Sequence, residues 1–438
     1  MNNGIWVGTE DLMREESFLQ SAEKEFSVAD IDQTDGKWET NRRDFLKLLG
    51  FGLGAATLAA SCEIPVKKAI PYVTKPDDIV PGVANYFASS FVNGGDYCAV
   101  LVKTREGRPI KIEGNTLSSV TGGGTSARAQ ASVLSLYDTR RIQHPGTVKE
   151  GNVTKQEWNA FDREVKAKLA AGGNIRLITH TIISPTAKKA LAEFTAKYPN
   201  SRVVTYDPVS NAALLAANEQ SFGSRAIPSY KFGAADVIVS FGADFLGTWI
   251  SPVEYARDYG KRRSARSTGN TNTFRHYQVE SHMSLTGSNA DDRVLIKPSE
   301  MGAAIVALYN ELTGGSGGPA ISNEKSKAAI KKMAQDLSAH KGRSLVVCGS
   351  NNVMEQLYVN QINNLLGNLN NTIDFSTVSY QRQGDERDMI RLVEEMSAGQ
   401  VAVAIVWGAN PAYELPNAGR FKEAFAKVGT RISFSGIL

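Results

Sequence analysis

The residue types that most often bind metals are few in this chain and stand far apart. Its 438 residues include five histidines and the cysteines Cys62, Cys98 and Cys348. An iron–sulfur cluster or structural zinc site takes about four such ligands, and cysteine ligands usually come in close pairs such as CxxC. No CxxC, HxxH or HExxH spacing occurs. The sequence therefore predicts no metal site, and a disulfide between Cys98 and Cys348 stays open as an alternative to two free thiols.

Polar and glycine-containing loops at the ends of predicted strands are the other residues that could take part in chemistry. Three such loops end or follow the runs 202–206, 235–242 and 401–407. Their residues are Asp207, Pro208, Gly242, Asp244, Gly408, Asn410 and Pro411. In an open parallel sheet flanked by helices, ligands bind beyond the carboxyl ends of the strands. We therefore predict that the three loops line one cleft, while tight strand-to-helix turns are the alternative.

Alternating helices and short apolar strands must position these loops from about residue 155 onward. The pattern predicts helices at 158–169, 185–197, 211–222, 301–312 and 354–366. It predicts strands at 175–179, 202–206, 235–242, 344–349, 401–407 and 430–435. Buried strands that lack polar alternation and are separated by helices indicate parallel sheets covered on both faces. The predicted fold class is therefore α/β.

A smaller β-rich region precedes these elements. Residues 97–104 and 109–115 are rich in β-branched and apolar residues and flank the turn Arg105–Arg108, which predicts a hairpin. Residues 127–137 follow a glycine-rich loop and predict a helix. The four prolines between positions 65 and 81 predict an extended tether ahead of the hairpin, because proline fixes φ and lacks a donor.

A pair of arginines near the N-terminus precedes an apolar run that spans residues 48–60. The residues concerned are Arg42, Arg43, Phe45, Leu46 and Lys47. The run has the length of a signal peptide and is too short to cross a bilayer, which takes about 18–20 residues. The pattern resembles the twin-arginine (Tat) export signal, with Asn41 where serine or threonine is usual. This resemblance implies export by the Tat translocase, and a surface helix of the folded body is the alternative.

Small residues stand directly before Cys62, and the sequence Ala59–Cys62 resembles a lipobox. It departs from that pattern at Ala59, where leucine is usual. Lipidation at Cys62 is therefore one prediction, and the alternatives are ordinary cleavage near Ala60 or an uncleaved anchor. The signal also differs from most export signals because about forty residues precede its arginines.

Composition sets limits on the class of protein. The formal net charge is +4, from 49 basic and 45 acidic residues, which gives no reason to expect a nucleic-acid partner. A hydrophobic content of 42% is typical of a globular chain long enough for several domains. We divide the chain into an extended export region at 1–62, a tether and β-rich subdomain at 63–150, an α/β domain at 151–300 and a second α/β domain at 301–438.

Four of these strings, in order along the chain, resemble the molybdopterin oxidoreductase superfamily. They are the hairpin Gly107–Asn115, the strand end Ala235–Asp244, the helix Gln361–Asn368 and the turn Gly408–Pro411. The resemblance implies a molybdopterin-oxidoreductase-like body, in which Gly242, Asp244 and Gly408 through Pro411 would line a vestigial cofactor cleft. Together with the extended export signal, the match resembles the large iron–sulfur subunit of alternative complex III, a bacterial quinol:electron-acceptor oxidoreductase.

The departures from the superfamily decide which cofactors to expect. Active members hold a [4Fe–4S] cluster with a cysteine run before the hairpin, and this region offers only Cys98. Cys348 ends an apolar strand and is predicted to be core, while a serine molybdenum ligand at Ser281 or Ser284 stays open. We therefore expect no catalytic residue, no metal and no molybdopterin in this chain. In the resembling protein, iron–sulfur clusters belong to a C-terminal half, which is expected beyond Leu438.

The resemblance implies a scaffold on the periplasmic face of the inner membrane. Its partners would be the membrane and multihaem cytochrome subunits of a respiratory complex, with no nucleic acid. Two other functions stay open at this point. One is an active molybdopterin-dependent periplasmic oxidoreductase, and the other is a periplasmic α/β binding protein.

Overall fold

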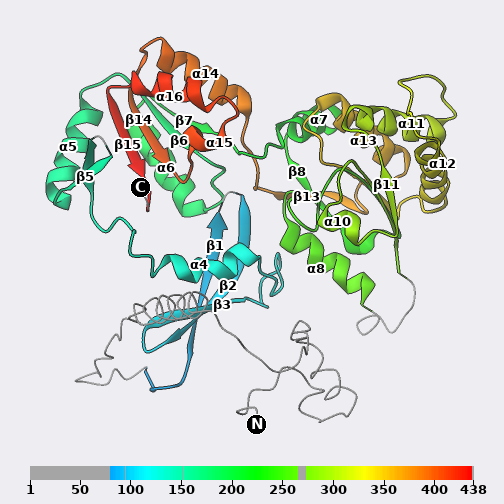
Figure 1. The fold of residues 1–438 in the computed structure, drawn as a ribbon, viewed down its shortest axis with the longest axis horizontal. Helices are drawn as coiled ribbons and strands as arrows, with labels where there is room; N and C mark the ends of the chain where they lie inside the picture. Colours follow the sequence, from blue (N-terminus) through cyan, green and yellow to red (C-terminus); the bar gives the residue numbers. More distant parts are fainter. Residues whose placement is uncertain (1–78, 94, 150, 265–272, 437–438) are drawn as a thin grey trace, which may run out of the picture. The chain divides into compact units, whose positions relative to one another are not determined.

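The computed structural model describes residues 79–93, 95–149, 151–264 and 273–436 (Figure 1). The description below concerns the unit formed by residues 76–438. The residues of the predicted export signal and lipidation site lie outside the described residues. They are Arg42, Arg43, Phe45, Leu46, Lys47 and Cys62.

The β-rich region is a three-stranded antiparallel sheet. Its order is β1 (Asn85–Asn93), β2 (Asp96–Arg105) and β3 (Arg108–Gly114). The predicted hairpin between β2 and β3 is confirmed, and β1 was not predicted. The turn residues Glu106 and Gly107 have φ angles of 50° and 76°, as a two-residue hairpin turn requires.

Helix α4 (Ala127–Ser135) covers one face of this sheet. The core between them is small, with Cys98, Val100, Ile112 and Ala129 as its buried members. Ser126 caps the helix by accepting a hydrogen bond from the Ala129 backbone N–H. The predicted helix 127–137 is therefore confirmed, with its end two residues earlier.

The first parallel sheet combines strands from distant parts of the chain. Its order is β15 (Thr430–Phe434), β14 (Val401–Trp407), β6 (Asn174–Thr179) and β7 (Ser201–Thr205). Neighbouring strands are all parallel. The helices that cover it are α5 (Trp158–Ala170), α6 (Pro185–Lys197), α14 (Glu386–Ser397) and α16 (Ala418–Ala426). Alternate strand residues enter two separate cores, one with α14 and α16 and one with α5 and α6, so both faces are covered as predicted.

The second parallel sheet has the order β11 (Asp292–Leu295), β10 (Arg275–Glu280), β9 (Val237–Phe241) and β12 (Ser344–Cys348). One face packs on α11 (Met301–Thr313), α12 (Glu324–Ala339) and α13 (Val353–Leu365). The other packs on α7 (Ala212–Phe222) and α8 (Pro252–Arg263), with an aromatic core that includes Phe232, Phe245 and Tyr255.

The predicted α/β class is confirmed, and the topology adds an unexpected feature. Each parallel sheet takes strands from both sides of residue 300, because β14 and β15 pair beside β6 while β12 pairs beside β9. Two antiparallel pairs complete the strands: β8 (Ile227–Tyr230) with β13 (Ile373–Ser379), and β4 (Gly146–Lys149) with β5 (Asn152–Lys155). No helix within the described ranges is both long and apolar enough to cross a membrane.

Candidate functional site

The predicted cleft residues lie at the carboxyl ends of two different sheets. Gly242 and Asp244 follow β9, whereas Gly408 and the residues after it follow β14. Both glycines have a φ of +62°, in the left-handed region that favours glycine. Gly408 is exposed, with open space where a side chain would be, and Pro411 begins the short helix α15 (Pro411–Glu414).

The loop after β9 is held by its own hydrogen bonds. Asp244 Oδ1 accepts from the backbone N–H of Thr286 at 3.0 Å and from its hydroxyl at 2.8 Å. Thr248 donates to the other carboxylate oxygen at 3.3 Å. A Cβ added to Gly349, which follows β12, would lie 2.5 Å from the Gly242 carbonyl oxygen. The two neighbouring strand-end loops are therefore in direct backbone contact.

The serine that was left open as a metal ligand also has a structural partner. Ser284 follows β10, caps the short helix α10 (Leu285–Ser288) and donates from its hydroxyl to Glu280 Oε2 at 2.6 Å. Arg293 Nε donates to Glu280 at 2.5 Å. Burial opposes the charge on Glu280, but the hydrogen bonds from Ser284 and Arg293 outweigh it and lower its pKa. The Ser284 hydroxyl therefore stabilises the ionised form of the buried Glu280 carboxylate.

The loop after β14 is fastened by Glu414. Its Oε2 accepts from the Asn410 backbone N–H at 3.1 Å, pairs with His180 Nε2 at 2.9 Å and accepts from the Tyr206 hydroxyl. His180 follows β6 and Tyr206 follows β7, so one carboxylate ties the ends of three strands. Burial disfavours the charge, yet the hydrogen bonds from Tyr206 and His180 outweigh it and lower the pKa of Glu414.

Asp207 makes a second tie at the same sheet edge. It is 4% exposed and accepts from the Thr181 backbone N–H at 3.1 Å, the Thr181 hydroxyl at 2.6 Å and the Gly384 backbone N–H at 2.8 Å. Gln383 donates its backbone N–H to the Thr181 hydroxyl at 2.7 Å. A Cβ on Gly384 would lie 2.4 Å from the Asp207 nitrogen, so only glycine fits there.

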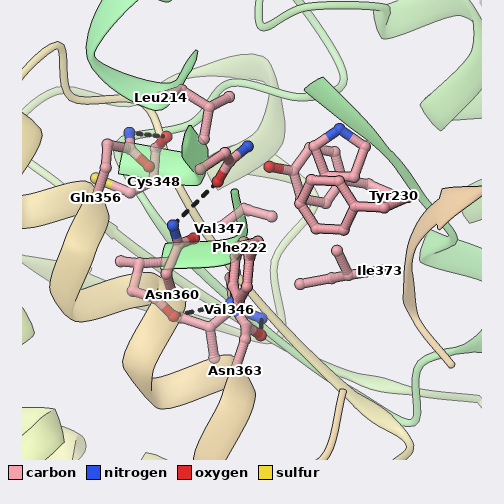
Figure 2. Close-up of a pocket in the computed structure, with 14 residues that line it drawn as sticks. Leu214, Phe222, Tyr230, Val346, Val347, Cys348, Gln356, Asn360, Asn363 and Ile373 are labelled. Carbon is pink, nitrogen blue, oxygen red and sulfur yellow. Dashed lines mark hydrogen bonds between the residues drawn. The ribbon is translucent and has the colours of Figure 1, made fainter. Parts of the chain in front are cut away.

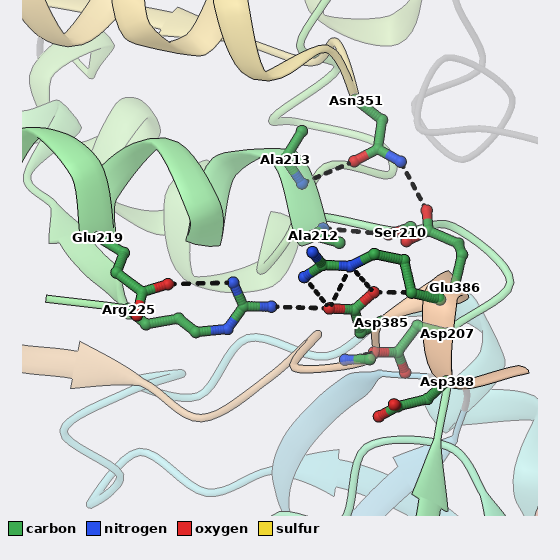
Figure 3. Close-up of polar contacts among 12 residues, drawn as sticks. Asp207, Ser210, Ala212, Ala213, Glu219, Arg225, Asn351, Asp385, Glu386 and Asp388 are labelled. Atoms are coloured by element: carbon green, nitrogen blue, oxygen red, sulfur yellow. Dashed lines mark hydrogen bonds and ion pairs between the residues drawn. The ribbon is translucent and has the colours of Figure 1, made fainter. Parts of the chain in front are cut away.

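A polar network extends this tie toward the second sheet (Figure 3). Asn351, which follows β12, accepts from the Ala213 backbone N–H at 3.0 Å and donates to Glu386 at 2.6 Å. Arg225 donates to Asp385, the N-cap of α14, at 3.1 Å. The carboxyl edges of both sheets therefore meet at residues 207–213, 351 and 383–388, a set that includes the predicted strand-end residues Asp207 and Pro208.

Sequence reasoning missed most of these ties. Asp207 was predicted as part of a strand-end loop, but Glu414 and Gly384 carried no spacing that linked them to it. The charged string Asp385–Asp388 at the start of a helix was a further local signal, because acidic residues favour helix N-termini. Several of the ties join residues far apart in the chain, up to 234 residues for His180 and Glu414, which no local pattern reports.

A small pocket lies between α7, α13 and the second sheet (Figure 2). Its volume of about 10 Å³ is roughly that of one water molecule. Asn360 donates to Asn218 at 3.0 Å, and Asn363 donates to the Val346 carbonyl at 2.7 Å. The pocket is a small gap in the packing of side chains. Asn363 belongs to the segment 361–368, which resembles the superfamily, and accepts a hydrogen bond from the Val346 backbone N–H in β12.

The described residues do not fit a [4Fe–4S] cluster. Cys98 lies in β2 and Cys348 in β12, and both are buried, free thiols, so they form no disulfide with each other. The nearest polar partner of the Cys98 thiol is a serine, because Cys98 Sγ donates a weak hydrogen bond to the Ser126 hydroxyl at 4.0 Å. The carbonyl oxygen of Gly123 fills the space that a Cβ on Gly114 would take, at 1.8 Å. Within the described ranges, no group of three or more His, Cys, Asp or Glu could hold a metal.

Comparison with known proteins gives one informative match. No protein-family model matches the chain. The menaquinone reductase molybdopterin-binding-like subunit of Nitratidesulfovibrio vulgaris is 23% identical over 386 residues, which cover 77% of this chain and 54% of the relative. The chain thus spans about half the length of that relative.

Among solved structures, the chain has a likeness to a chain of the formyltransferase/hydrolase complex of Methylorubrum extorquens. The two are 14% identical with a TM-score of 0.44, over 66% of this chain and 81% of the other. A likeness at this level carries no functional argument. The sequence match instead supports the coarser prediction: the chain is similar to a molybdopterin-binding-like subunit of a quinone reductase.

Proposed function

We propose that this chain is the cofactor-less, molybdopterin-oxidoreductase-like portion of the iron–sulfur subunit of a quinol:electron-acceptor oxidoreductase of the alternative complex III type. It acts as a scaffold at the periplasmic face of the inner membrane. Its partners are membrane and multihaem cytochrome subunits, and the iron–sulfur clusters belong to another part of the protein.

The observation that carries this proposal is the match to a subunit named as molybdopterin-binding-like. The chemistry of the strand ends agrees with a scaffold. At both carboxyl edges, carboxylates that could have faced a ligand bind the protein itself, as Asp207, Asp244 and Glu414 do. The two described thiols cannot supply the four thiolates of a cluster.

Metal analysis of the native, membrane-extracted complex tests the proposal. After the subunits are separated, iron is expected with the full-length iron–sulfur subunit and molybdenum with none. Molybdenum that follows this chain would instead support an active molybdopterin-dependent oxidoreductase. A chain that purifies alone and binds a small molecule would support a periplasmic binding protein.

Export can be tested separately from assembly. Replacing Arg42 and Arg43 by lysine is expected to leave the protein in the cytoplasmic fraction, because the paired arginines form the Tat-like motif. The matched control replaces another pair of adjacent arginines, the exposed Arg140 and Arg141, by lysine. This change should leave export unchanged. Normal export of the Arg42→Lys/Arg43→Lys variant would exclude the Tat route.

A further inference from the structure

Strand β1 is an exposed edge of the three-stranded sheet. It pairs antiparallel with β2 through nine consecutive residues, Asn85–Asn93, without a bulge. Within the part of the chain that the structure describes, no strand pairs with its outer side. Seven of its nine residues are exposed, and only Asn85 and Phe91 are half-buried. A strand of this kind presents backbone N–H and C=O groups that a further strand can bind.

The opposite edge of the same sheet is protected in the usual ways. Strand β3 contains Pro109, which has no N–H, and charged residues at Arg108, Lys111 and Glu113. Its register with β2 also shifts between Lys103 and Thr104. Charges, proline and irregular register all discourage the addition of another strand. Strand β1, with the sequence NYFASSFVN, has none of these features.

The side chains of β1 are also unusually apolar for an uncovered strand. Tyr86, Phe87 and Val92 are 49%, 57% and 47% exposed. More than half of the exposed large apolar side chains in the described ranges lie between Val80 and Trp158. The β-rich region is therefore the part of the described chain where an apolar cover is missing.

A row of residues across the sheet indicates which kind of side chain a covering strand would place there. Tyr86 lies opposite Lys103, and Lys103 lies opposite Lys111 in the register. The ammonium group of Lys103 lies 5.5 Å from the centre of the Tyr86 ring and 3.9 Å from the Glu113 carboxylate on β3. A side chain on an added strand would stand about 5 Å from Tyr86, on the same face of the sheet. Because Lys103 and Lys111 together outnumber Glu113 in this part of the sheet, a carboxylate is the group that this position favours.

We propose that β1 binds an extended segment of a partner subunit, which adds as a fourth strand and places an acidic side chain beside Tyr86. This rests on the proposed function, since it requires a complex with other polypeptides. A second copy of this chain fits less well, because β1 has no acidic residue to meet Lys103. A lipid surface also fits less well, since hydrocarbon cannot satisfy the backbone groups of an open edge.

Retention of the chain in the membrane-extracted complex tests the proposal. Ser90→Lys places a charge on the exposed edge and should lower the fraction that co-purifies with other subunits at least ten-fold. Lys103→Gln should lower it about three-fold by removing the cation that would face the acidic side chain of the partner. The matched control Ile110→Lys, on the protected edge, should leave retention unchanged. Unchanged retention of Ser90→Lys would overturn the proposal.

A second measurement does not depend on these substitutions. A photoreactive benzoylphenylalanine at exposed position Phe87 should crosslink, in the complex, to one acidic segment of an identified partner subunit. Crosslinks to a second copy of this chain, or to lipid only, would overturn the proposal. If the chain co-purifies with no other polypeptide at all, the proposed function fails instead, and the two failures are therefore distinguishable.

Discussion

The carboxyl edges of the two parallel sheets are held together in different ways. At the β14 edge, Asp207 and Glu414 bind groups that are far away in the chain, such as Gly384 and Tyr206. At the β9 edge, Asp244 binds Thr248 and Thr286, which lie only 4 and 42 residues away. The first edge therefore depends on long-range closure, and the second on nearly local contacts.

This difference indicates that equal chemical changes should have unequal effects at the two edges. A buried carboxylate that joins several segments leaves several donors unpaired when it is altered. A half-buried carboxylate within one pair of neighbouring loops can be replaced in part by water. The following changes test this comparison.

The largest effect is expected from Gly384→Ala. The added methyl group would overlap the backbone at Asp207 and Tyr206, so we expect a loss of about 3 kcal/mol in the free energy of unfolding. Urea denaturation followed by circular dichroism measures it. The control Gly260→Ala lies in helix α8 with open space and should stabilise the protein by about 0.5–1 kcal/mol. An unchanged free energy of unfolding for Gly384→Ala would mean that the backbone at Gly384 does not contact the backbone at Tyr206 and Asp207.

Next in size is the difference between Asp207→Asn and Asp244→Asn. An amide can replace only part of the acceptor capacity of a carboxylate, and Asp207 is buried with three donors. We expect about 2–3 kcal/mol lost at Asp207 and about 1 kcal/mol at Asp244. Equal losses in the same denaturation assay would remove the proposed contrast between the edges.

Glu414→Gln should have a smaller, pH-dependent effect. Its folded-state pKa is lowered, so its charge contributes fully above the unfolded-state pKa of about 4.3 and this contribution is lost as the pH falls through the folded pKa. We expect a cost of about 1–2 kcal/mol at pH 7 that shrinks as the pH falls below about 4.3 and through the folded-state pKa. Exposed Glu423→Gln is the control and should stay within about 0.5 kcal/mol. A difference that does not vary with pH would contradict the role of the charge.

The smallest losses of stability, and the smallest difference between the two edges, are expected for Gly242→Ala and Gly408→Ala. Both glycines have a φ of +62° and neither would meet a close steric contact, so each variant should lose about 1 kcal/mol through backbone strain. Thermal unfolding of the two variants should agree within the error of the measurement. A much larger loss at either position would show that the added methyl group meets a steric contact there.

Local sequence patterns were sufficient for helices α4–α7, α11 and α13 and for the most apolar strands. The helix Pro185–Lys197 and the strand Val401–Trp407 were predicted with their observed bounds, since a capping serine and an uninterrupted apolar run mark their ends. The elements that were not predicted are helices α8, α10, α12, α14, α15 and α16 and strands β1, β4, β5, β8, β10, β11 and β13. β1 has serines in its centre, and β10 alternates charged and polar residues with apolar ones although it is buried.

The vestigial cofactor cleft stays a prediction. Its residues Gly242 and Gly408 do follow the carboxyl ends of strands, as the apolar runs predicted. Which loops meet depends on how strands pair, and no pattern in the sequence shows that β14 lies beside β6. Glu414 and Asn351 could not be identified for the same reason, because their partners are set by that pairing.

The interleaving of the two sheets has a consequence for how the protein is made. Asn174 and Gln400, which meet at the start of β6 and β14, lie 226 residues apart. At synthesis rates of about 5–20 residues per second, β6 leaves the ribosome at least roughly ten seconds before its neighbour exists. During that interval, the edge of β6 that β14 will cover can form non-native contacts. A chaperone that shields nascent strands is therefore most needed while residues 206–400 are being translated, and ribosome-bound intermediates halted in this window should be the most prone to aggregate.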